Sequence, residues 1–220
     1  MLQACVRPFK VLLPKGKHYR KLHLGPASGC VMDIDLSSQL RPYFGIYETE
    51  LAPYFKRLVT SGANCFDIGG REGYYALVMA KLSRGKVASF ECEHAEIEPM
   101  RQTFARNPLL SIQVVEAFVG AKDGDGFMTI DRAAQEIFVP NFIKMDIEGG
   151  EEGALEGASE TLAKHRPNLI IEVHGADKEA RCVSILRSFH YQITFIDQSK
   201  ILADSFRTGY NRWIAAVPGN

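Results

Sequence analysis

The chain has 220 residues, of which 46% are apolar and 24% charged. This balance excludes a disordered chain, a collagen-like repeat and a disulfide-rich miniprotein. Lysine and arginine together number 26, as do aspartate and glutamate, so no excess of positive charge favours nucleic acid as a partner.

Five cysteines are scattered along the chain, with no C-x-x-C pair and no histidine at the spacing of a zinc site. They fit a reduced protein of the cytoplasm. The apolar run at the N-terminus is interrupted at Pro14 and Lys15, so it supplies neither a signal-peptide core nor the roughly 20 apolar residues of a membrane helix. We therefore expect a cytoplasmic protein that does not insert into a membrane.

The first 45 residues predict a small β appendage. The short extended segments FKVLL, KLHL and CVMDIDL alternate there with Pro- and Gly-rich turns, a pattern typical of antiparallel hairpins. Residues 46–62 then show apolar side chains on one helical face and end at Gly62, where a helix C-terminal glycine is expected. We assign residues 1–45 to the appendage and residues 46–220 to the main domain.

Strand and helix patterns alternate along the main domain. The predicted strands are 64–69, 86–91, 111–120, 141–148, 168–175, 191–197 and 211–217, and the main helices between them are 74–83, 95–107, 151–165 and 177–190. A short strand, FMTI, and a short helix precede residue 141. Such alternation predicts an α/β fold, a doubly wound parallel sheet of about seven strands with helices on both faces. The final strand is expected to pair antiparallel.

The segment FDIGGREGYY (66–75) consists of a strand, a glycine turn and a helix start. Gly69, Gly70 and Gly73 let the backbone approach a ligand closely, and the helix that follows offers free N–H groups to polar or anionic atoms. We predict a nucleotide-like ligand at this turn. A tight strand-to-helix turn without a ligand is the alternative.

Two features narrow the choice of nucleotide. The dinucleotide fingerprint would need glycine where Arg71 and Tyr74 stand, which argues against NAD. Glu91, at the end of the next strand, is placed to accept hydrogen bonds from both hydroxyls of a ribose. A strand-end carboxylate that is merely solvated is the alternative for this residue alone.

Charged residues also end the fourth and fifth strands. Lys144, Asp146 and Glu148 alternate, so a strand period of two would point all three to the same face. Because unpaired charges are costly to bury, a structural Lys144–Asp146 ion pair is an alternative to catalysis. Glu172 and His174 share a face in the same way, and His174 is either a site residue or a solvated loop residue.

Two further interpretations concern the same region. Asp146 and Glu172 stand at adjacent strand ends, where Mg²⁺ with oxygen ligands is conceivable, although nothing in the sequence requires a metal. Glu151 and Glu152 begin the next helix. Carboxylates in a first turn suit the helix dipole, so we give these two no role in the site.

Together these segments resemble the class I S-adenosylmethionine-dependent methyltransferases and, among them, the FkbM-like family. The similarity spans about residues 45–175 and rests on FDIGGREGYYAL, FECEHAEIEPMRQTFARN, MTIDRAAQ and FIKMDIEGGEEGALEGASETLAKHRPNLIIEVHG. The last segment is the most specific, because its strand ends in Lys-x-Asp-x-Glu-Gly-x-Glu and a Pro-x-hydrophobic-Glu strand follows. The resemblance implies a Rossmann-like fold of seven strands and methyl transfer, usually to oxygen.

The resemblance also implies which residues hold the cofactor S-adenosylmethionine. Asp67 would lie near its methionine end, Glu91 would bind the ribose, and Glu116 or the backbone of Ala117 would meet the adenine amine. Tyr74 would either reach the cofactor or pack its helix. The full set is Asp67, Gly69, Gly70, Gly73, Tyr74, Glu91, Glu116 and Ala117.

The chain departs from the family pattern at two places. Gly70-Arg71-Glu72 replaces the usual Ala-Asn-hydrophobic segment, and Cys92 replaces the proline after the second-strand acid. We therefore expect these two departures to alter cofactor affinity and local loop geometry rather than the fold.

We therefore expect an O-methyltransferase acting on a small molecule or a sugar, with no nucleic-acid or membrane partner. The candidate catalytic residues are Lys144, Asp146, Glu148, Glu172 and His174, with Asp146 nearest the methyl group. A carboxylate of ordinary pKa is a poor base for an alcohol, so burial, a histidine relay or a metal would have to assist it. The appendage and segment 197–210 are expected to shape the acceptor pocket. An N-methyltransferase and a catalytically silent cofactor-binding module are the alternatives.

Overall fold

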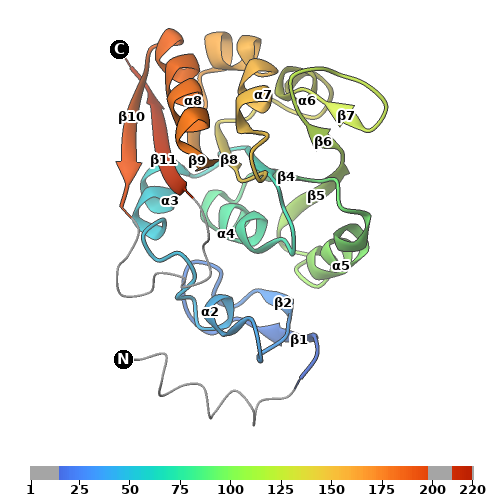
Figure 1. The fold of residues 1–220 in the computed structure, drawn as a ribbon. Coiled ribbons are helices and arrows are strands. Elements are labelled where there is room, and N and C mark those ends of the chain that lie inside the picture. Colours follow the sequence, from blue (N-terminus) through green and yellow to red (C-terminus); the bar gives the residue numbers. More distant parts are fainter. Residues whose placement is uncertain (1–14, 198–209, 220) are drawn as a thin grey trace.

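The computed structural model describes residues 15–197 and 210–219. Its centre is a seven-stranded sheet in the order β10-β11-β9-β8-β3-β4-β5 (Figure 1). The strands are β3 (Cys65–Ile68), β4 (Lys86–Glu91), β5 (Ser111–Glu116), β8 (Phe142–Met145), β9 (Asn168–His174), β10 (Tyr191–Ile196) and β11 (Asn211–Pro218). β11 runs antiparallel to both of its neighbours, and the pairs among β3, β4, β5, β8 and β9 are parallel. The predicted doubly wound, mostly parallel sheet with an antiparallel final strand is confirmed.

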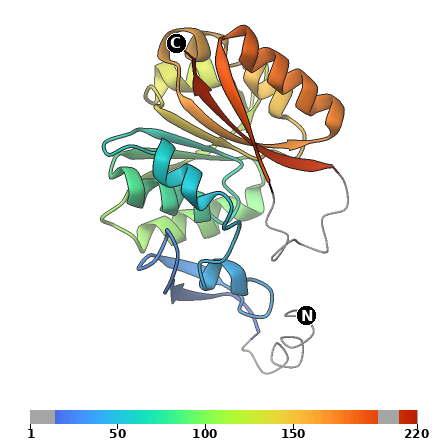
Figure 2. The ribbon, with the colours of Figure 1, turned by 90° about the vertical axis from the view of Figure 1, so that its left-hand side faces the viewer.

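Helices cover both faces of this sheet (Figures 1 and 2). On one face lie α3 (Ala52–Leu58), α4 (Tyr74–Ser83) and α5 (His94–Ala105), and on the other lie α6 (Ile130–Glu136), α7 (Glu151–Glu156) and α8 (Ala176–Ser188). Each face of the sheet has its own hydrophobic core, the first beneath α3, α4 and α5 and the second beneath α6, α7 and α8. Successive strand residues point into opposite cores, as Cys65 belongs to the first and Phe66 to the second. Trp213 is fully buried in the first core, as expected. Within the described residues, no helix is long and apolar enough to span a membrane.

The expected N-terminal hairpin is present. β1 (His18–Lys21) pairs antiparallel with β2 (Val31–Ile34), and the short helix α2 (Leu40–Tyr43) follows. The hairpin lies on the side of α4 and α5 (Figure 2), where Asn107 ties it to the main domain by exchanging two side-chain hydrogen bonds with the backbone of Val31. The segment FKVLL lies outside the described residues, β1 begins before the predicted KLHL strand, and the boundary at residue 45 stays a prediction.

The predicted helix over residues 46–62 is wrong in extent, because α3 covers only Ala52–Leu58. Pro53 stands in its first turn, where a missing N–H costs nothing. Upstream, Glu48 has a φ of 44°, which a right-handed helix does not accommodate. Gly62 lies in a turn beyond the helix rather than at its end.

Two other predicted elements are interrupted. The strand over 111–120 ends at Glu116, and β6 (Phe118–Val119) then pairs with β7 (Phe127–Met128) in a separate two-stranded sheet. The helix over 151–165 breaks after α7 and resumes with the π-helical turn η1 (Thr161–His165). The break has a tertiary cause, since the Asp131 carboxylate accepts hydrogen bonds from the backbone N–H groups of Glu160 and Thr161.

Candidate active site

The carboxyl ends of β3 and β8 are locked together. The backbone N–H of Asp146 donates to the carbonyl of Ile68 at 2.9 Å. Gly69 follows with a φ of 81°, and a Cβ atom there would lie 1.9 Å from the Asp146 carbonyl oxygen. This glycine is therefore required by the close approach of two backbones, independently of any ligand.

Lys144 is buried beneath this junction. Its Nζ donates to the Gly69 carbonyl at 3.0 Å and lies 3.5 Å from Oδ1 of Asp67, which is itself fully buried and accepts from Ser89 Oγ. Burial alone would lower the pKa of the Lys144 ammonium, but the surrounding carboxylates, Asp67 foremost, outweigh burial and raise it. The Lys144–Asp146 ion pair, the alternative to a catalytic role, is therefore wrong in its partner, because Lys144 pairs with Asp67. These contacts position the glycine turn, and a catalytic role of Lys144 stays a prediction.

The expected alternation of Lys144, Asp146 and Glu148 on one strand face is also wrong. β8 ends at Met145, and the chain turns so that Glu148 adopts a φ of 53°. Asp146 and Glu148 therefore stand in the loop after the strand. Both carboxylates lie near His174 of β9.

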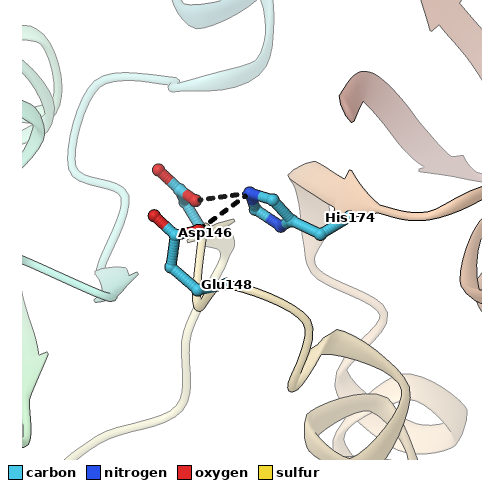
Figure 3. A group of neighbouring side chains, drawn as sticks. All are labelled: Asp146, Glu148 and His174. Carbon is cyan, nitrogen blue, oxygen red and sulfur yellow. Dashed lines mark ion pairs between the residues drawn. The ribbon is translucent and has the colours of Figure 1, made fainter. Parts of the chain in front are cut away.

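His174, the last residue of β9, meets these two carboxylates. Its Nε2 lies 3.8 Å from Oδ1 of Asp146 and 3.6 Å from Oε2 of Glu148 (Figure 3). The His174 side chain is 13% exposed and that of Glu148 is 74% exposed, so the group is open to solvent on the Glu148 side. We call Asp146, Glu148 and His174 the strand-end cluster. Three of the predicted catalytic residues are thus brought together.

Glu151 is the site residue that the sequence analysis missed. It is fully buried in the first turn of α7, and its Oε1 lies 2.8 Å from Nδ1 of His174. Burial would raise the pKa of Glu151, but hydrogen bonds from His174 and from the N–H of Gly149 lower it. The hydrogen bond to Glu151 is in turn the main cause that raises the pKa of His174, with burial opposing. A first-turn carboxylate gives no sequence signal that separates this role from a helix-dipole contact.

Glu172 and Arg71 border the cluster. Glu172 is 5% exposed within β9, and its charge contributes to the raised pKa of His174. Arg71 reaches across from the glycine turn and places its guanidinium 3.8 Å from Oε1 of Glu148. The residue that departs from the family pattern therefore connects the glycine turn to the cluster.

The predicted ribose-binding acid lies where expected, at the end of β4. Glu91 is 6% exposed and accepts hydrogen bonds from the backbone N–H groups of Arg71, Cys92 and Glu93. A carboxylate has about four acceptor positions, so one stays available for a hydroxyl group. The remaining acceptor position fits one ribose hydroxyl rather than the two expected from the sequence.

The other predicted cofactor residues surround this strand end. Ala117 donates its N–H to the Glu91 carbonyl, and Glu116 lies 3.1 Å from His94 Nδ1. Tyr74 is buried with its ring edge-on to Tyr47. Cβ atoms on the two remaining glycines would come too close to neighbouring side chains: Gly70 at 2.3 Å from Ser89 Oγ and Gly73 at 2.6 Å from Phe104. Most of segment 197–210 lies outside the described residues.

One family model and several solved structures are similar to this chain. The model of the methyltransferase FkbM domain matches residues 127–200, a range that includes the strand-end cluster and Glu151. No curated protein sequence matches the chain.

Solved structures share the fold at low identity. Precorrin-6y C5,15-methyltransferase from Geobacter metallireducens aligns with a TM-score of 0.56 and 14% identity, over 76% of this chain and 86% of that one. Methyltransferase FkbM from Methylobacillus flagellatus aligns with a TM-score of 0.55 and 20% identity, over 70% of this chain and 43% of that one. Fibrillarin from Aeropyrum pernix was solved with S-adenosylmethionine bound. It aligns with a TM-score of 0.53 and 10% identity, over 73% of this chain and 68% of that one. The expected Rossmann-like architecture is confirmed.

Proposed function

We propose that this chain is an FkbM-like class I S-adenosylmethionine-dependent methyltransferase and that it transfers the methyl group to a hydroxyl oxygen of a small molecule or a sugar. The observation that carries the choice of oxygen is the strand-end cluster with its buried partner Glu151. A hydroxyl is a weak nucleophile until it loses its proton, so an oxygen acceptor needs such a group of bases more than a neutral amine does.

The residues around β4 fit the cofactor by the chemistry of their donors and acceptors. Glu91 would accept a hydrogen bond from a ribose hydroxyl, and the backbone around Ala117 with Glu116 would hold the adenine. When bound, S-adenosylmethionine supplies a methyl group on a sulfonium that needs no further activation. The chain has only to align the acceptor and manage its proton.

Three charged residues around the glycine turn then have positioning roles. Lys144 fixes the carbonyl of Gly69, and Asp67 holds the Lys144 ammonium in place. Asp146 is tied to β3 by its backbone, so its carboxylate is held beside the turn. We propose that Asp146 orients the acceptor hydroxyl and that the strand-end cluster assists the loss of its proton on the open, Glu148 side.

The acceptor class and the compartment are part of the same proposal. Equal numbers of acidic and basic residues support a small acceptor rather than a nucleic acid. Free thiols at Cys30, Cys65, Cys92 and Cys182 support a reducing, cytoplasmic location.

A transfer assay tests the proposal. The purified chain is incubated with methyl-labelled S-adenosylmethionine and with paired acceptors that differ only in carrying a hydroxyl or an amine, drawn from sugars, polyketides and phenols. Label is expected in the hydroxyl member of a pair. Label in amines alone would establish a nitrogen acceptor, and cofactor binding without transfer to any acceptor would favour a silent module.

A further inference from the structure

The three side chains of the strand-end cluster do not hydrogen-bond to one another. The distances from His174 Nε2, 3.6 Å to Glu148 and 3.8 Å to Asp146, exceed the about 2.7–3.2 Å of an N–H···O hydrogen bond. Two atoms bound to one ion at about 2.1 Å each can lie up to about 4.2 Å apart. One atom from each residue falls within 4.8 Å of the others. The spacing therefore suits a shared ion better than direct contact.

The orientation of His174 points the same way. Glu151 is fully buried and is not part of the cluster, and its Oε1 accepts a hydrogen bond from Nδ1 of His174. This contact directs Nε2 of His174 at the two carboxylates (Figure 3). The tautomer that donates Nδ1–H to Glu151 aims its Nε2 lone pair at the two carboxylates, a pose that a positive charge lying between these three groups would satisfy. A carboxylate on the far nitrogen is the arrangement that holds metal-ligating histidines in other proteins.

The fixed cations nearby do not supply that charge. Lys144 is engaged with Asp67 and the Gly69 carbonyl. Arg71 lies near Oε1 of Glu148, on the oxygen that does not face His174, and both of these side chains are largely exposed. Oε2 of Glu148 is thus left directed at His174.

We propose that Asp146, Glu148 and His174 bind a divalent cation and that Glu151 is its positioning residue. One imidazole nitrogen with two carboxylate oxygens suits an ion of the Mn²⁺ or Zn²⁺ type. The exposed Glu148 side leaves coordination positions open to solvent. This inference rests on the proposed function and deepens it: the acceptor hydroxyl takes an open position, its coordinated oxygen becomes more acidic, and its proton leaves to solvent on the open side.

Binding of Mn²⁺ alone, followed by electron paramagnetic resonance, tests the site without any acceptor. The wild-type chain is expected to bind one Mn²⁺ with a spin-echo modulation from an imidazole nitrogen. Asp146→Asn and His174→Ala are expected to weaken binding at least about tenfold, and His174→Ala to remove the nitrogen modulation. Glu151→Gln is expected to weaken binding about 10–100-fold, the usual effect of losing such a partner.

Glu152→Gln is the matched control, because Glu152 is the adjacent carboxylate and pairs with Arg181 instead. It is expected to bind Mn²⁺ as the wild type does. Absence of stoichiometric binding by the wild type at millimolar Mn²⁺ would overturn the proposal, as would wild-type affinity in the folded Asp146→Asn and His174→Ala variants. If either variant fails to fold, the nitrogen modulation of the wild type and the Glu151→Gln affinity decide.

Calorimetry with S-adenosylhomocysteine on the same samples separates this proposal from the function it rests on. Cofactor-product binding without Mn²⁺ binding overturns the metal site alone. Mn²⁺ binding without any binding of the cofactor product overturns the methyltransferase mechanism while the metal site stands.

Discussion

Replacing Lys144 by methionine tests whether this residue holds the fold or acts in catalysis. Lys144→Met keeps the length of the side chain and removes the ammonium from the Asp67 carboxylate, which is fully buried. Leaving one member of a buried ion pair without its partner costs about 3–5 kcal/mol. For a chain of this size that corresponds to a fall in Tm of about 6–20 °C.

Urea titration measures the loss, with the fluorescence of the single, buried Trp213 as the signal. Lys164→Met is the control, because Lys164 pairs with Glu160 at an exposed position, and it should change the free energy of unfolding by less than about 0.5 kcal/mol. Adding Asp67→Asn to Lys144→Met should recover part of the lost stability, since neither member of the former ion pair then carries a charge. A loss below about 1 kcal/mol with abolished methyl transfer would refute the structural role of Lys144.

Further variants test the cofactor site and the turn. Glu91→Ala should weaken binding of S-adenosylhomocysteine by about 1.5–3 kcal/mol by calorimetry, the range for hydrogen bonds to a charged group, and unchanged affinity in a folded variant would assign the ribose to another acid. Gly69→Ala should destabilise the chain by more than about 3 kcal/mol, because its Cβ would meet the Asp146 carbonyl oxygen at 1.9 Å. Gly126 has a φ of 72°, and a Cβ atom there would have nothing within 4 Å. Gly126→Ala should therefore cost only the about 1–2 kcal/mol of a left-handed backbone. Equal losses of stability in the two variants would show that crowding at Gly69 is not the cause.

The fold was predictable because its signals are local. Alternating strand and helix periods identify the sheet, and the turn at Gly69 follows a buried strand as the pattern requires. Asp146, Glu148 and His174 could be expected near one another for a topological reason: β8 and β9 are adjacent parallel strands, so their carboxyl ends share one edge.

The misses have tertiary causes. The predicted strand over 141–148 is too long, because β8 ends at Met145 and the chain then turns where Glu148 takes a left-handed conformation. Glu151 is another miss, because a first-turn carboxylate looks the same in sequence whether it is solvated or buried against His174. The partner of Lys144 depends on the register of β3 with β8, which places Asp67 opposite it, and no local pattern reveals that register.

The proposed function requires the strand-end cluster to act in methyl transfer beside a cofactor held by the first strands of the sheet. Asp146→Asn tests it most directly, compared with Asp177→Asn, which removes an exposed carboxylate at the start of α8. Label transfer from S-adenosylmethionine to a hydroxyl acceptor and the Kd for S-adenosylhomocysteine are measured on both variants. Asp146→Asn is expected to slow transfer by at least about a hundredfold with a Kd within a few-fold of wild type, while Asp177→Asn is expected to behave as wild type. Transfer at the wild-type rate by folded Asp146→Asn would contradict the proposed function.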